Sequence, residues 1–180
     1  MRYLYNKIEF FLNGVPRTAV IPPGMTALDY LHRELGLYGT KCSCNEGDCG
    51  ACTVAIAEAR EGGIRYEAIN SCLYPAARLH GKHLITIEAL GTPEQLHPIQ
   101  EAMLQFHATQ CGYCSPGFVM SAFALFAERA HPSREELLAG LEGNLCRCTG
   151  YDSILRAMLD LAARDEEIVP PHIRSVEKLL

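Results

Sequence analysis

Cysteine is the residue type with the most chemistry to offer in this sequence, with nine copies among 180 residues. Four of them share the spacing C-x4-C-x2-C followed by a lone downstream cysteine: Cys44, Cys49, Cys52 and Cys72. This spacing is typical of a plant-type 2Fe–2S cluster, in which one loop wraps the irons and supplies three of the four thiolates. Gly47 and Gly50 stand inside that loop, where they let backbone N–H groups approach the sulfur atoms. The first candidate site is therefore an iron–sulfur site.

Zinc and disulfides are the alternatives at this first site. A structural zinc ion also takes four thiolates, but it usually binds two C-x2-C pairs, and Cys49 and Cys52 supply only one. Disulfides need an oxidising compartment. The N-terminal segment has no apolar signal-peptide core and no twin-arginine pair, and no apolar run approaches the ~20 residues of a membrane span. We therefore expect a cytoplasmic protein whose cysteines bind metal or carry out redox chemistry.

Cys42 falls outside the C-x4-C-x2-C spacing. Free cysteine is among the most buried residue types and behaves as a small hydrophobic residue. We therefore predict a buried packing role for Cys42 rather than one as a substitute ligand or a redox sensor.

A second set of cysteines lies in "QCGYCSPG" at residues 110–117 and "NLCRCTGY" at 144–151. The first segment holds a C-x2-C pair between two predicted helices, and the second holds a C-x-C pair just before another helix. Two pairs at helix ends could meet around one metal centre. From spacing alone, zinc and a 2Fe–2S cluster both remain open here.

The elements that must position the first loop read as a small sheet. Asn13-Gly14 separates the apolar runs "IEFFL" and "VPRTAVI" and predicts a tight hairpin, because both residues tolerate positive φ. Thr26 is a predicted helix cap, and Gly36 is the predicted end of that helix. Strands are expected at "TVAIA", "IRYEAI" and "LITI". We expect a mixed sheet packed against one helix over residues 1–88.

Beyond this region the apolar residues recur at helical spacing. Four short helices are predicted. The first and the last carry apolar stripes, from Ile99 to Phe106 and from Ile154 to Leu159. The second starts with Ser115 as cap and Pro116 in the first turn, and the third starts with a capping box from Ser133 to Glu136. Their brief connections indicate a bundle over residues 89–165. The tail at 166–180 contains Pro170-Pro171 and is predicted to be extended.

Five segments carry a family resemblance: "GTKCSCNEGDCGACTV", "NSCL", "LHPIQEAM", "QCGYCSPGF" and "GNLCRCTGY". In this order they resemble the iron–sulfur chain of the xanthine dehydrogenase family of molybdenum hydroxylases, from residue 8 to about 160. The resemblance implies an α+β fold, with an N-terminal β-grasp, plant-type ferredoxin-like domain followed by a C-terminal four-helix bundle that holds a second 2Fe–2S cluster. It also favours iron–sulfur over zinc at the second site.

The same resemblance implies a role for particular residues. The ligands of the first cluster would be Cys44, Cys49, Cys52 and Cys72, and those of the second would be Cys111, Cys114, Cys146 and Cys148. Gln110 matches a glutamine that hydrogen-bonds the molybdopterin cofactor, and Cys148 matches the ligand that lies against the pterin. The chain departs from the family pattern at Ser43, where glycine is usual, and at Asp152-Ser153, where proline is common and where either residue could cap the last helix.

Several function classes are disfavoured by composition. The net charge of −5 and the absence of any Lys/Arg run argue against nucleic-acid binding. The seven histidines are scattered, and no spacing links one to a nucleophile, so we expect no catalytic residue in this chain. No Walker loop or dinucleotide fingerprint occurs. The chemistry should therefore lie with the cysteines.

The resemblance implies an electron-transfer subunit, since 180 residues leave no room for flavin or molybdenum domains. The expected partners are a molybdopterin-binding large subunit and an FAD-binding medium subunit, in a heterotrimer or a dimer of heterotrimers. Electrons would pass from molybdenum through both clusters to flavin during hydroxylation of a purine, another N-heterocycle or an aldehyde, as in xanthine dehydrogenase. The alternatives are a freely diffusing 2Fe–2S carrier and a zinc-stabilised interaction module without redox activity.

Overall fold

The computed structural model describes residues 6–180, so residues 1–5 of the predicted 1–88 domain lie outside the described residues. The N-terminal half forms a mixed five-stranded sheet in the order β2-β1-β5-β3-β4. Its strands are β1 (Asn6–Leu12), β2 (Val15–Ile21), β3 (Thr53–Arg60), β4 (Gly63–Asn70) and β5 (His83–Ile85). Among residues 6–180, the β1–β5 pair is parallel and the other strand pairs are antiparallel. The predicted mixed α+β class is confirmed.

Local signals placed the first elements correctly. β1 and β2 pair in register across Asn13 and Gly14, whose φ values of +52° and +85° suit a tight turn. The Thr26 side chain accepts a hydrogen bond from the Asp29 backbone N–H and so caps α1 (Ala27–Asp29), which continues as a π-helical segment, η1 (Tyr30–Glu34). Two 3₁₀ segments, η2 (Ala76–Leu79) and η3 (Ile87–Ala89), flank β5.

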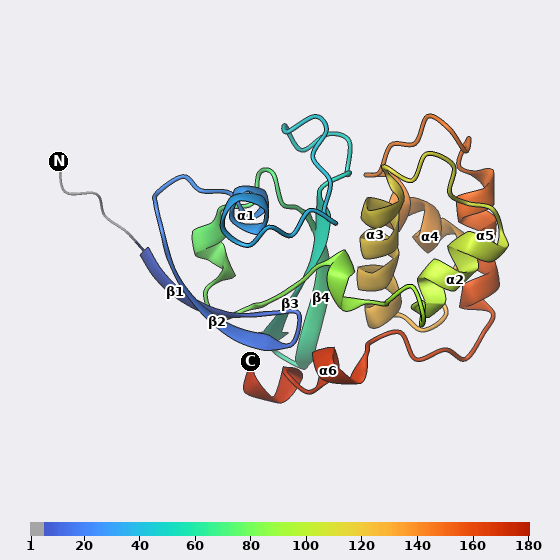
Figure 1. The fold of residues 1–180 in the computed structure, drawn as a ribbon. Coiled ribbons are helices and arrows are strands. Elements are labelled where there is room, and N and C mark those ends of the chain that lie inside the picture. Colours follow the sequence, from blue (N-terminus) through green and yellow to red (C-terminus); the bar gives the residue numbers. More distant parts are fainter. Residues whose placement is uncertain (1–5) are drawn as a thin grey trace.

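Residues 53–57 of β3 are buried on both faces of the sheet, and Figure 1 shows α1 on one side of the sheet and the longer helices on the other. Val54 and Leu84 belong to the core beneath α1, together with apolar residues of the first hairpin. The neighbouring Ala55, Ala57 and Ile85 point the other way and join the core of the helical half. Because alanine is small, α3 can approach β3 closely. The hydrophobic core therefore continues from the sheet into the helices.

The helical half contains α2 (Pro98–Gln105), α3 (Ser115–Glu128), α4 (Arg134–Leu141) and α5 (Asp152–Ala162). The helix α2 contacts α3 and α5, and α4 contacts α3 and α5. The predicted capping box of α4 is confirmed, since the Ser133 side chain accepts from the Glu136 N–H and Glu136 accepts from the Ser133 N–H. A second capping box at α2 uses His97 and Gln100.

Two predicted helix caps were wrong. The N-cap of α3 is Cys114, and the Ser115 hydroxyl pairs with that of Thr109 at 3.0 Å instead. The N-cap of α5 is Tyr151, which has a left-handed φ of +70°, while Asp152 pairs with Arg156 one turn along. Both helices start directly from cysteine-bearing loops, so the path of those loops decided the caps against local preference.

The prediction of an extended tail was wrong beyond residue 170. Pro171–Arg174 form the helix α6, and Glu177–Leu179 form a 3₁₀ turn, η4. Pro171 stands at the first helical position, where its fixed φ favours a helix. Ile173 and Val176 are buried, and Figure 1 shows the tail running back beneath the sheet. Burial of these apolar residues repays the ordering of the tail.

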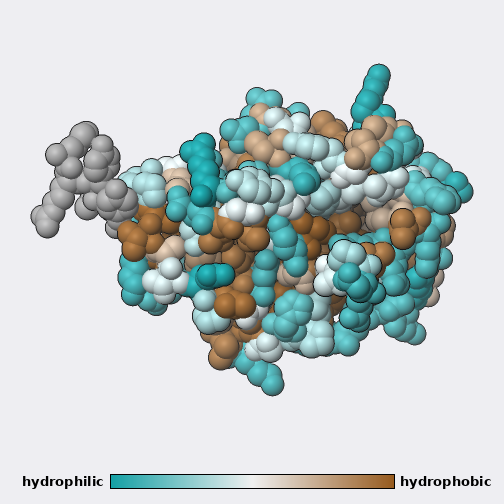
Figure 2. All heavy atoms as spheres, in the orientation of Figure 1, coloured by the Kyte–Doolittle hydropathy of each residue, from teal (hydrophilic) through white to brown (hydrophobic). Residues whose placement is uncertain are grey.

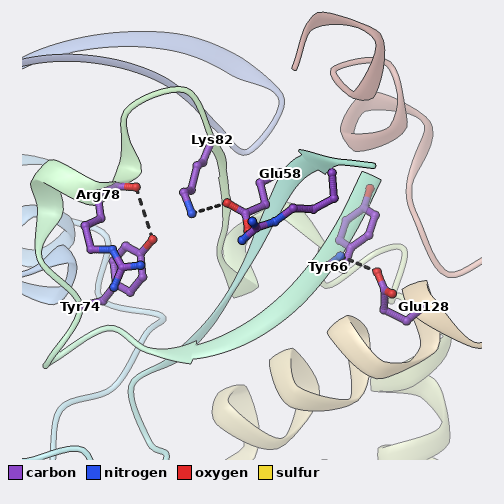
Figure 3. A network of polar contacts seen from close by, with 7 residues as sticks. Glu58, Tyr66, Tyr74, Arg78, Lys82 and Glu128 are labelled. Atoms are coloured by element: carbon purple, nitrogen blue, oxygen red, sulfur yellow. Dashed lines mark hydrogen bonds and ion pairs between the residues drawn. The ribbon is translucent and has the colours of Figure 1, made fainter. Parts of the chain in front are cut away.

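Polar contacts join α3 and the tail to the outer strand of the sheet. Figure 3 shows Glu128 of α3 facing Tyr66 of β4, whose backbone N–H it accepts. The Tyr66 hydroxyl donates to the Glu177 carboxylate at 2.6 Å, and burial together with this carboxylate raises the pKa of Tyr66. On the neighbouring strand, Glu58 pairs with Lys82 and Arg60. The edge strand β4 is therefore held both by α3 and by the C-terminal tail.

The surface shown in Figure 2 is mainly hydrophilic, with apolar residues exposed over the β1–β2 side. Val15 and Val20 of β2 are exposed to 52% and 63%. Among residues 6–180, no helix has the length and apolar character needed to cross a membrane.

A buried histidine couples the stability of the sheet to pH. His83 is fully buried, its Nε2 accepts from the Gly14 N–H at 2.9 Å, and its Nδ1 has no hydrogen-bond partner. Burial, aided by the charge of His172, lowers the pKa of His83 to about 4. Since the unfolded chain has the higher histidine pKa, it takes up protons first as the pH falls. The contribution of neutral His83 to the stability of the fold is therefore complete above the pKa of histidine in the unfolded chain, and it is lost as the pH falls below that pKa.

As the pH falls from 7 to 5, we expect protonation of His83 in the unfolded chain to lower the free energy of unfolding by about 2 kcal/mol. His83→Gln keeps an acceptor for the Gly14 N–H but has no titrating group. Urea unfolding at the two pH values should therefore show a smaller loss in this variant than in the parent protein. Equal losses in the two proteins would assign the acid sensitivity to other groups.

Candidate iron–sulfur sites

The first cysteine set gathers at the loop before β3, which Figure 1 shows at the upper edge of the sheet. The Cys44 sulfur accepts backbone N–H bonds from Glu46 at 3.5 Å and from Cys49 at 3.4 Å. These donors, with a contact from the Cys49 thiol, lower the pKa of Cys44 to about 7. A thiolate held by backbone N–H groups is the form that a metal cluster requires.

The other half of the first set lies deeper. Cys52 and Cys72 are buried beside Leu28, and the three side chains pack together. Burial and the neighbouring Cys52 thiol raise the pKa of Cys72 to about 12. Cys44 with Cys49 and Cys52 with Cys72 thus form two neighbouring pairs.

The second set forms where the loops before α3 and α5 meet. The Sγ atoms of Cys111 and Cys148 lie 3.7 Å apart on the surface. Cys114 and Cys146 form the inner pair, and burial together with the Cys146 thiol raises the pKa of Cys114 to about 12. The Cys146 sulfur receives the Thr149 N–H at 3.4 Å and lies 3.1 Å from the Thr149 hydroxyl. Although burial opposes ionisation, these contacts lower the pKa of Cys146.

Both sets have a two-plus-two arrangement that fits a cluster with two metal atoms. Two thiolates on one tetrahedral centre with bonds of about 2.3 Å lie about 3.8 Å apart, close to the outer pair of the second site. All nine cysteines are free. Within residues 6–180, no group of three or more His, Cys, Asp or Glu side chains has the arrangement of a single-ion site. With two thiol pairs, each set supplies the four thiolate donors that a 2Fe–2S cluster takes.

The remaining predicted residues lie at the surface. Gln110 is exposed in the loop between α2 and α3, next to Cys111. Cys42 is exposed, so its predicted burial was wrong. It belongs to an irregular loop, and its thiol donates to the Asn45 side chain at 3.8 Å.

Sequence reasoning missed the residues that join the two sites. The Leu145 N–H donates to the Cys49 carbonyl at 3.0 Å, and Asn144 hydrogen-bonds Gly50. The Tyr113 hydroxyl donates to the Cys42 carbonyl. Their positions gave a sequence signal, since Tyr113 lies between two cysteines of the second set and Leu145 directly precedes Cys146. Their partners lie about 70 to 95 residues away and follow no local rule.

Comparison with known proteins identifies both halves. Residues 10–77 match the family described as 2Fe-2S iron-sulfur cluster binding domain, and residues 86–159 match the family described as 2Fe-2S binding domain. The chain is 48% identical over 156 residues to a xanthine dehydrogenase from Blastobotrys adeninivorans. That match covers 84% of this chain and 11% of the relative.

Solved structures give a match along the whole chain. A chain of quinoline 2-oxidoreductase from Pseudomonas putida 86 is 34% identical, with a TM-score of 0.76 and coverage of 97% of both chains. This chain belongs to the xanthine dehydrogenase family of molybdenum hydroxylases and corresponds to its iron–sulfur part.

Other members carry the same unit within longer chains. This chain is 36% identical to aldehyde oxidoreductase from Desulfovibrio gigas, with a TM-score of 0.79, over 88% of its own length and 17% of that chain. It likewise spans only 11–12% of the curated relatives that it matches.

Proposed function

We propose that this iron–sulfur subunit conducts electrons, one at a time, from a molybdopterin-binding large subunit to an FAD-binding medium subunit. The observation that carries the proposal is the presence of two separate sets of four free cysteines, each arranged as two pairs. Bound 2Fe–2S clusters would each supply one reversible electron at a potential set by the surrounding protein.

The first cluster would be held by Cys44, Cys49, Cys52 and Cys72. The N–H groups on the Cys44 sulfur stabilise negative charge there, and the buried Cys52–Cys72 side limits access of water. The second cluster would be held by Cys111, Cys114, Cys146 and Cys148. Its Cys111–Cys148 edge is exposed, while Cys114 and Cys146 face the core.

The contrast between the exposed edge and the inner edge of the second site supports a direction of electron transfer. The exposed Cys148 edge, with Gln110 beside it, suits contact with a molybdopterin on the large subunit. On the inner edge, Leu145 precedes Cys146 and bonds the Cys49 carbonyl of the first site. Electrons would enter at Cys148, cross at Leu145, and leave through the first site to flavin.

The wider assignment rests on the family. We propose a xanthine dehydrogenase-like assembly in the cytoplasm, a heterotrimer or a dimer of heterotrimers, that hydroxylates a purine, another N-heterocycle or an aldehyde. We also propose that residues 1–88 and 89–165 act as a β-grasp domain and a four-helix bundle, one cluster each. Free cysteines suit a reducing compartment.

Anaerobic reconstitution tests the core of this proposal. The full chain should bind about four iron and four sulfide per molecule, and dithionite should produce two distinct electron paramagnetic resonance signals. Zinc in a colourless protein would instead support the interaction module. Co-purification of the native protein with molybdopterin and flavin chains is expected, whereas recovery of the loaded chain alone would favour the freely diffusing carrier.

A further inference from the structure

The buried amide of Asn144 lies where the two cysteine sites meet. We call this contact the seam, and it joins Cys49, Gly50 and Thr53 to Gly117, Ser121, Asn144 and Leu145. Asn144 is 3% exposed, in the loop that joins α4 to α5. Its Nδ2 donates to the Gly50 carbonyl at 3.0 Å and to the Thr53 hydroxyl at 3.2 Å, and its Oδ1 accepts from the Ser121 hydroxyl at 2.6 Å. Both amide hydrogens and the amide oxygen are therefore engaged, which fixes the orientation of the side chain.

The next residue, Leu145, makes a direct backbone hydrogen bond between the sites. The Leu145 N–H donates to the Cys49 carbonyl at 3.0 Å, so one peptide hydrogen bond connects Cys49 to the residue before Cys146. The seam is also tightly packed, because a Cβ on Gly117 would lie 2.3 Å from the Gly50 carbonyl oxygen. Asn144 therefore fixes the α4–α5 loop at the position where hydrogen bonds connect the two sites.

We propose that Asn144 is a positioning residue that sets the electronic coupling between the two clusters; this rests on the function proposed above. Electron tunnelling weakens steeply with distance and is favoured by a continuous path of covalent and hydrogen bonds. Without the Nδ2 donor, the Gly50 carbonyl would keep only the N–H and hydroxyl of Thr53, which lie on its own side of the seam. The side-chain hydrogen bond across the seam would be lost, which favours opening of the seam. The Leu145–Cys49 bond would lengthen with it, and the clusters would be less strongly coupled.

Asn144→Asp is the direct test, because aspartate still accepts from Ser121 but cannot donate to Gly50 when ionised. The matched control is Asn13→Asp, since the Asn13 amide also uses both its nitrogen and its oxygen in hydrogen bonds, here to Thr86 within the N-terminal half. The readout is the splitting that magnetic interaction adds to the resonance spectrum of the fully reduced, fully loaded chain. We expect the splitting to be weakened or lost in Asn144→Asp and retained in Asn13→Asp, with both signals and the iron content unchanged.

Ser121→Ala serves as a milder variant if Asn144→Asp does not load. It removes only the bond that orients the amide, so a partial loss of splitting is expected. Unchanged splitting in the loaded Asn144 or Ser121 variants would overturn the proposal. A parent spectrum equal to the sum of two single-cluster spectra would also overturn it, because there would be no coupling to set. A parent chain that binds fewer than two clusters would refute the proposed function itself.

Discussion

Cys72→Ala and Cys114→Ala should each halve the iron content of the reconstituted protein, from about four to about two atoms per chain. Each variant removes one thiol of the less exposed pair from a different set, so each should lose a different resonance signal and keep the other. Alanine is chosen because serine could act as a substitute ligand. Iron and acid-labile sulfide assays with resonance spectra of the reduced protein measure the outcome.

Cys42→Ala is the control for both substitutions. Cys42 lies in the same loop as the first set but is exposed and outside both pairs of that set. It should retain about four iron atoms and both signals. Loss of a cluster in this variant would make Cys42 a ligand. Full loading of Cys72→Ala or Cys114→Ala would remove that cysteine from its proposed set.

Gly50→Ala should be the most destabilising small substitution at the seam. Gly50 has a φ of +69°, and an added Cβ would lie 2.3 Å from the Gly143 carbonyl oxygen and 2.5 Å from the Asn144 Nδ2. The backbone conformation alone costs an alanine about 1–2 kcal/mol. Overpacking against backbone adds about 1–3 kcal/mol, because the Gly143 carbonyl cannot rotate away like a side chain.

Gly81→Ala separates these two contributions. Gly81 has a similar φ of +73°, but an added Cβ there would meet no atom within 4 Å. Its cost should therefore be limited to about 1–2 kcal/mol of backbone strain. Urea unfolding followed by far-ultraviolet circular dichroism compares the two variants with the parent protein. Equal destabilisation by both substitutions would show that the two halves are not tightly packed at Gly50.

Short-range patterns were sufficient for most elements and for the composition of the two sites. The Asn13-Gly14 hairpin and the Ser133 capping box depend on residues within a few positions, so their sequence signals were reliable. The cysteine spacing also identified the candidate ligands, because a loop that wraps a cluster must present thiols at set intervals. The domain division and the ligand assignments remain predictions.

The pairing of the cysteines and the seam depended on packing over long stretches of chain. Cys111 meets Cys148 across 37 positions, and Asn144 meets Gly50 across 94. Helix caps at Cys114 and Tyr151, the burial of the C-terminal tail and the exposure of Cys42 had the same origin. Residue types and spacing specify which atoms can bind a cluster, since those are properties of short segments. The contact between the two sites emerges only when the core brings α3 and the α4–α5 loop against β3, because no local interaction can encode that contact.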